Sequence, residues 1–175
     1  MNRKAQINYI ITGALIAAAY AGLTYLSNVF GLAYGPIQLR VSEILTILPV
    51  FTPAAIPGLT VGCFIANIGS FNVADMVFGT AATLLAALLT YIFKEIKIKG
   101  IPFLSFLMPV IVNALIIGFE IALFFLPEGA TFWGFAISAL EVGLGELIVC
   151  LGFGTPFYLV VKKYKFFEKI FYNKR

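Results

Sequence analysis

The sequence has no histidine and only two cysteines among its 175 residues. Without histidine the chain lacks the commonest metal ligand and the commonest general base, so we expect neither an enzyme nor a bound metal or cofactor. Cys63 and Cys150 lie in apolar segments and form no CxxC pair, so we expect them to pack as small hydrophobic side chains. A GxxxxGK[ST] motif is also absent, so any ATP would be hydrolysed by other subunits.

Charged residues are scarce along most of the chain. Hydrophobic residues make up 61% of it, and the mean hydropathy of +1.01 is too high for an ordinary soluble domain. Eleven of the twelve Lys and Arg residues lie at the chain ends and in one central loop. The positive-inside rule predicts that these three groups are cytoplasmic. Attraction to anionic membrane lipid explains the net charge of +4 more simply than nucleic-acid binding does.

The apolar runs predict an all-α integral membrane protein, a single domain over residues 1–175 with six transmembrane helices and both termini cytoplasmic. The expected spans are 8–27, 37–51, 54–68, 74–93, 101–126 and 132–161, and we expect the first to be a retained span rather than a signal peptide. The second and third are short and flanked by Pro49, Pro53 and Pro57, so a re-entrant hairpin is an alternative. The sixth is long enough to tilt or kink near 152–156.

Several polar residues fall in or beside these spans, where each charge costs about 2.5–3.5 kcal/mol at a helix centre. The side chains that we select as candidates for a substrate-binding site are Arg40, Glu43, Asn67, Asp75, Asn113, Glu120, Trp133 and Glu141. From the directions of the spans, most of them lie in the outer half of the membrane. Several acids against one deep cation leave a surplus of carboxyl groups, which suits a ligand that is cationic or carries several N–H donors.

These residues also have structural interpretations. Arg40 and Glu43 are three residues apart and can neutralise each other, and Asp75 is favoured at a helix N-terminus by the helix dipole. The asparagines can hydrogen-bond across helices, and Trp133 fits an interfacial aromatic belt. Glu120 and Glu141 have no neighbouring cation in the sequence, which makes a structural role harder to assign.

Two faces of small residues run along the first span. One consists of Ala14, Ala18 and Gly22, and the other of Gly13, Ala17 and Ala21. Small residues four apart let helices approach closely. Internal packing explains one such face, and we expect the other to dock on another membrane protein.

With six expected spans and a small-residue first helix, the chain resembles the substrate-binding S components of energy-coupling factor (ECF) vitamin transporters. Two stretches are more specific, namely LRVSEILTILPVFTPAAIPGLTVGCFIAN at 39–67, with its RVSE and TPAAIPG segments, and EVGLGELIV at 141–149. Through these stretches the chain resembles the QueT family of queuosine-precursor transporters.

The resemblance implies a multi-pass protein of the bacterial plasma membrane with the S-component bundle. It implies binding of a 7-deazaguanine, either queuine or its aminomethyl or cyano precursor, near the outer face. Through Ala14, Ala18 and Gly22 the chain would dock on a transmembrane coupling subunit driven by two ATPase subunits. Two alternatives stay open, namely an S component for another vitamin, and a proton-coupled secondary transporter with Glu120, Glu141 or Glu146 as a proton relay.

Overall fold

The computed structural model describes residues 3–33, 39–127, 129, 131–165 and 167, and its regular elements in this part are all helices. The elements are α1 (Arg3–Val29), the 3₁₀ helix η1 (Val41–Val50), α2 (Ala55–Ile68), α3 (Val73–Ile92), the 3₁₀ turn η2 (Phe93–Glu95), α4 (Phe103–Phe124), α5 (Phe132–Leu147), the π-helix η3 (Ile148–Phe153) and α6 (Gly154–Tyr164). No β-strand is found among the described residues, and the predicted all-α class is confirmed.

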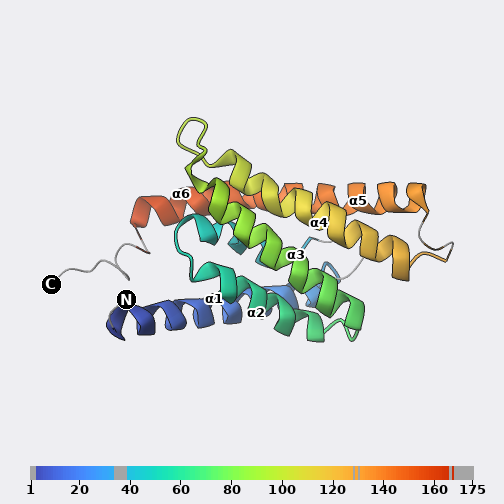
Figure 1. The fold of residues 1–175 in the computed structure, drawn as a ribbon, viewed down its shortest axis with the longest axis horizontal. Helices are drawn as coiled ribbons and strands as arrows, with labels where there is room; N and C mark the ends of the chain where they lie inside the picture. Colours follow the sequence, from blue (N-terminus) through green and yellow to red (C-terminus); the bar gives the residue numbers. More distant parts are fainter. Residues whose placement is uncertain (1–2, 34–38, 128, 130, 166, 168–175) are drawn as a thin grey trace.

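The long helices pack as neighbours in chain order, α1 on α2, α2 on α3, α3 on α4 and α4 on α5 (Figure 1). The short helix η1 touches α1, α2, α3, α4, α6 and η3, so it lies in the middle of the bundle. The residues just before and within η1 are therefore surrounded by the other helices. This placement makes η1 the natural support for a buried site.

The six expected helical segments are present, but they differ in length. Four helices are long and apolar enough to cross a membrane, at Arg3–Val29, Val73–Glu95, Phe103–Phe124 and Phe132–Tyr164. The second and third segments are shorter, and α2 spans only about 21 Å against about 30 Å of hydrocarbon. The second segment, expected as a short span over 37–51, is a ten-residue 3₁₀ helix that contains Pro49.

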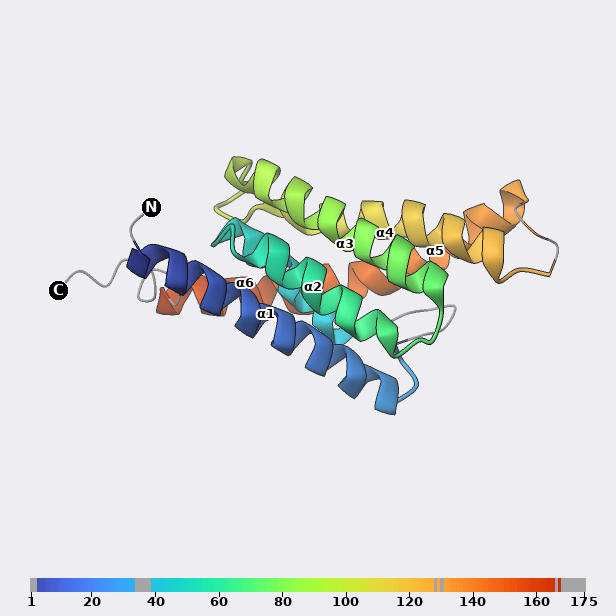
Figure 2. The ribbon, with the colours of Figure 1, turned by 60° about the horizontal axis from the view of Figure 1, so that its bottom comes forward.

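The clusters of Lys and Arg meet at one end of the bundle. Helix α1 begins and α6 ends at this end, and the connection from α3 to α4 also lies there (Figure 2). Lys162 Nζ donates a hydrogen bond to the carbonyl oxygen of Gly100 at 3.1 Å, which ties α6 to that connection. We call this the basic end, defined by Arg3, Lys4, Lys94, Lys97, Lys99, Lys162, Lys163 and Lys165. The opposite end, where α1 and α4 finish, is called the distal end.

A buried contact between α3 and α4 accommodates a proline inside a helix. Pro109 has no N–H group and cannot donate to the carbonyl of Ser105. That carbonyl oxygen instead accepts a hydrogen bond from Thr90 Oγ1 at 3.2 Å, while Ser105 Oγ donates to the Thr90 carbonyl oxygen at 3.0 Å. Because an unpaired carbonyl costs several kcal/mol in hydrocarbon, this reciprocal pair stabilises both helices.

The last long helix changes geometry close to the expected kink. The π-helix η3 separates α5 from α6 and ends just before Gly154 and Pro156. A π-turn adds a residue to the helix and thereby rotates the helix face that is buried after it. Helix kinks commonly occur at π-turns and at prolines. The shift leaves Val149 and Cys150 buried in the bundle.

The two small-residue faces of α1 have different surroundings. A side-chain carbon added at Gly58 would lie 2.7 Å from the Gly13 carbonyl oxygen, and one added at Gly62 would lie 2.8 Å from the Ala17 carbonyl oxygen. These glycines therefore permit the close packing of α2 on α1. The residues of the other face, Ala14, Ala18 and Gly22, are exposed.

Candidate functional site

Buried polar side chains converge around η1 from several helices. Those with charged or amide groups are Arg40, Glu43, Asn67, Asn113, Glu120 and Glu146. In a membrane protein such groups are expensive to bury and are functional candidates by default. They form two connected layers, one near the distal end and one deeper in the bundle.

In the distal layer, Arg40 joins three parts of the chain. Its Nε donates a hydrogen bond to the Ala33 carbonyl oxygen at 2.8 Å, and its Nη1 donates to Asn67 Oδ1 at 3.3 Å. Asn67 Nδ2 in turn donates to the carbonyl oxygen of Asp75 at 2.8 Å. The guanidinium therefore fixes the segment after α1 against the end of α2 and the start of α3.

Glu120 reaches the distal layer from α4. The residue is buried, and neither of its carboxyl oxygens has a hydrogen-bond partner among the residues that the structure describes. The half-buried Asp75 and the buried Arg40 lie close enough to interact with it electrostatically. A buried carboxyl group without a donor is costly, so this position calls for a ligand or a proton to complete it.

Glu43 lies between the two layers and has one free acceptor. Its Oε1 accepts a hydrogen bond from the hydroxyl of Tyr20 on α1. Its Oε2 is buried and has no partner within the described part of the chain. Beside it, Thr24 Oγ1 donates to Ser42 Oγ at 2.7 Å, which fixes the first turn of η1 on α1.

The deeper layer is built on Glu146. Asn113 Nδ2 donates a hydrogen bond to Glu146 Oε1 at 3.0 Å. Cys150 Sγ donates to Glu146 Oε2 at 3.4 Å and lies 3.7 Å from Thr46 Oγ1. Both oxygens of Glu146 thus have protein partners, unlike those of Glu120.

The structure brings together six of the eight candidates chosen from the sequence: Arg40, Glu43, Asn67, Asp75, Asn113 and Glu120. Asn113 and Glu120 lie seven residues apart on α4, and both are buried. Glu141 is half-buried on α5. Trp133 is 73% exposed at the distal end and packs edge-on against Phe132. Binding roles for all eight residues stay predictions.

The set of substrate-binding candidates chosen from the sequence left out Glu146, which was considered only as a proton relay, and also Tyr20 and Cys150. A signal for Glu146 was available, because Val142, Gly145, Glu146 and Val149 have helical spacing and all are buried. For Tyr20 and Cys150 no such signal exists, since uncharged residues in apolar spans carry little cost that would mark them.

The chemistry of the cluster is rich in acceptors. Three buried acids and the half-buried Asp75 face a single buried guanidinium, and the donors of that guanidinium already reach Ala33 and Asn67. No group of three His, Cys, Asp or Glu side chains in the described ranges could hold a metal ion. The unused oxygens suit a ligand that presents N–H groups or a positive charge.

A family model described as QueT transporter matches residues 10–163. A curated relative, the queuosine precursor transporter QueT of Lactococcus lactis subsp. cremoris (strain MG1363), is 39% identical over 97 residues. That alignment covers 53% of this chain and 57% of the relative, so the chain spans little more than half the length of this relative. The search of solved structures gives no match. Since the family model covers most of a chain with four apolar helices able to span a membrane, this multi-pass bacterial membrane protein belongs to the QueT transporter family.

Proposed function

We propose that the chain is the substrate-binding component of an ECF-type importer that takes up a 7-deazaguanine queuosine precursor. Membership of a transporter family supports a substrate-specific transport role. The observation that carries the proposal is the set of buried oxygens on Glu120 and Glu43 that have no hydrogen-bond partner among the described residues. A ligand that supplies N–H donors would complete these acceptors.

The N–H donors of a guanine-like ring match the carboxylate acceptors of the site. A guanine-like ring presents N1–H and an exocyclic amine side by side, and one carboxylate can accept from both. Glu120 is the acceptor that we assign to this edge, and Glu43 Oε2 is a second acceptor for an amine or ring N–H group. Asp75 lies beside Glu120 and adds negative charge for a cationic substituent.

The other polar residues have supporting roles in this proposal. Arg40 and Asn67 position the distal layer, because their hydrogen bonds go to each other and to backbone carbonyls. Asn113 orients Glu146 from α4. Trp133 and Glu141 belong to the entry side, where an aromatic face and a half-buried carboxyl group can meet the arriving ligand.

The orientation that we propose follows the charge distribution. The basic end faces the cytoplasm under the positive-inside rule, which turns the distal end and Arg40 toward the outside. Ala14, Ala18 and Gly22 then form an exposed docking face for a transmembrane coupling subunit. Two ATPase subunits bound to that partner would supply the energy for uptake.

The proposal is tested by equilibrium binding to the purified chain in detergent. The ligands are queuine and its aminomethyl and cyano precursors, with guanine and riboflavin as controls. We expect saturable binding of at least one deazaguanine and weaker binding of both controls. A folded sample that binds none of the three would contradict the proposed substrate, and tight binding of riboflavin would favour a vitamin S component.

A proton-coupled secondary transporter would differ from an ATP-driven importer in its source of energy. Uptake into cells that lack the coupling and ATPase subunits, abolished by a protonophore, would favour proton coupling through the buried acids. The proposal predicts that no uptake remains in such cells.

A further inference from the structure

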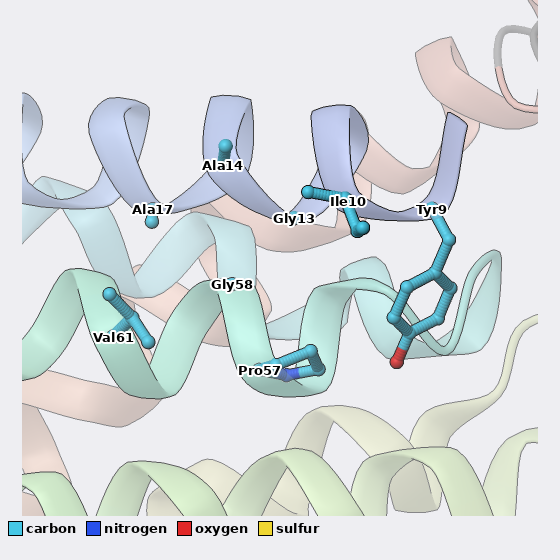
Figure 3. Close-up of a pocket in the computed structure, with 8 residues that line it drawn as sticks. All are labelled: Tyr9, Ile10, Gly13, Ala14, Ala17, Pro57, Gly58 and Val61. Atoms are coloured by element: carbon cyan, nitrogen blue, oxygen red, sulfur yellow. The ribbon is translucent and has the colours of Figure 1, made fainter. Parts of the chain in front are cut away.

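A narrow apolar groove lies between α1 and α2, toward the basic end. Its volume is about 290 Å³, and its lining consists of Tyr9, Ile10, Gly13, Ala14, Ala17, Pro57, Gly58 and Val61. Figure 3 shows Tyr9 at one end of the groove, with Ala17 and Val61 at the other. The Tyr9 hydroxyl donates a hydrogen bond to the Pro53 carbonyl oxygen at 3.4 Å, so its polar atom is engaged with the chain.

The dimensions of the groove select a thin occupant. The eight steps from Tyr9 to Ala17 rise about 12 Å along α1, so a volume of about 290 Å³ corresponds to a mean width of about 5 Å. A helix with its side chains is about 10–12 Å across, so it could insert only side chains into this space. A single hydrocarbon chain has a suitable width.

The depth of the groove also fits a lipid chain. Helix α1 has 27 residues and is about 40 Å long, which exceeds the hydrocarbon thickness of about 30 Å. Arg3, in its first turn, therefore lies at the level of the lipid head groups. The groove begins at Tyr9, about 9 Å further along the helix, where acyl chains start.

Arg3 lies on the same face of α1 as several residues that line the groove. Arg3, Gln6, Ile10, Gly13 and Ala17 follow the spacing of a single helix face, and Arg3 and Gln6 are both exposed. Lys4 is turned by about 100° from Arg3 around the helix. The remaining cations of the basic end add to the positive charge there. Among the described residues, Glu95 is the one acid at that end, and its carboxylate forms an ion pair with Lys97 at 3.3 Å.

From this arrangement we propose that the groove binds one acyl chain of an anionic phospholipid, with Arg3 contacting the phosphate head group. The apolar lining accounts for the chain, and the aligned cation accounts for the negative charge. The site is separate from the buried polar cluster and does not depend on the transported substrate. It shares Ala14 with the proposed docking face, so the acyl chain and the coupling subunit would compete at this position.

Native mass spectrometry of the full, delipidated chain tests the head-group contact. Phosphatidylglycerol and phosphatidylcholine with the same acyl chains are added in parallel, and we expect phosphatidylglycerol to be retained more strongly. Arg3→Gln should reduce this preference about fivefold, which corresponds to the contribution of one cation at a membrane surface. Lys4→Gln removes the same charge from another face and should reduce it much less. Equal retention of the two lipids, or equal effects of the two substitutions, would overturn the head-group assignment.

A pair of α2 substitutions tests the groove itself. Val61→Phe fills the groove and should lower retention of both lipids at least severalfold, while Ile65→Phe introduces the same side chain one turn further along. Val61 and Ile65 are both exposed on α2, so neither change should unfold the protein, and thermal unfolding of each variant checks this. Lipid retention that is unchanged in Val61→Phe, or lowered equally in Ile65→Phe, would contradict acyl-chain binding in the groove.

Discussion

At the scale of single residues, the cost of burying charge explains why some site residues were predictable. Glu43 and Glu120 stood out in the sequence because carboxyl groups are rare in apolar spans, and the structure buries both. Tyr20 could not be selected in the same way, since a tyrosine in an apolar helix is most often an ordinary packing residue. Its role depends on the fold, which places its hydroxyl against Glu43.

The bond between Tyr20 and Glu43 can be tested by removing the hydroxyl. Tyr20→Phe leaves both oxygens of Glu43 without a donor, so we expect a loss of about 1–3 kcal/mol in the free energy of unfolding. Thermal or denaturant unfolding in detergent measures this loss. Tyr25→Phe is the control, because Tyr25 is 39% exposed and its hydroxyl bonds a backbone carbonyl. An equal loss in both variants would argue against a special role for the buried pair.

At the scale of elements, the apolar runs predicted where helices occur, but not all of their geometry. The fourth expected span, 74–93, is close to the observed Val73–Ile92. The second differs, because Pro49 and contacts with six other helical elements favour a short 3₁₀ helix inside the bundle. Such tertiary contacts are invisible in hydropathy, and so is the choice of a π-helix at Ile148–Phe153.

The packing of α3 on α4 gives a test at this scale. Thr90→Val keeps the shape of the side chain but removes the donor to the Ser105 carbonyl, which Pro109 leaves free. We expect a destabilisation of about 1–3 kcal/mol, measured by thermal unfolding in detergent. Thr60→Val serves as the control, since Thr60 only bonds the Ile56 carbonyl within its own helix. Equal stability of the Thr90→Val variant and the wild type would show that the freed carbonyl needs no partner.

At the scale of the whole molecule, the positions of the cations were the most reliable guide. The three clusters lie far apart in the sequence, yet their described members meet at one end of the bundle, as an even number of spans between them requires. Sequence could not indicate which small-residue face of α1 stays exposed, because both have the same spacing.

The proposed orientation predicts which ends can be labelled from outside the cell. A cysteine introduced at Phe71, which is 96% exposed at the distal end, should react with a membrane-impermeant maleimide on intact cells. A cysteine at Lys97, at the basic end, should react only after the cells are opened. The native Cys63 and Cys150 are buried and should give little background. The reverse pattern would invert the topology.

The exposed face of α1 predicts a separation of binding from transport. Ala18→Leu adds bulk to the docking face, so uptake by cells with the full transporter should fall strongly while substrate affinity of the purified chain stays unchanged. Ala19→Leu makes the same change at an exposed neighbouring position outside this face and should leave uptake intact. Unchanged uptake in the Ala18→Leu variant would remove the face from the docking surface.

The central claim is that a buried acidic site holds the transported molecule, and Glu120→Gln tests it most directly. The measurement is the dissociation constant of the tightest-binding deazaguanine for the purified wild type, Glu120→Gln, Glu141→Gln and the surface variant Glu95→Gln. Loss of a charged hydrogen-bond acceptor should weaken binding by Glu120→Gln about tenfold or more, with Glu95→Gln unchanged and all variants folded. Full affinity in both Glu120→Gln and Glu141→Gln would contradict the proposed site.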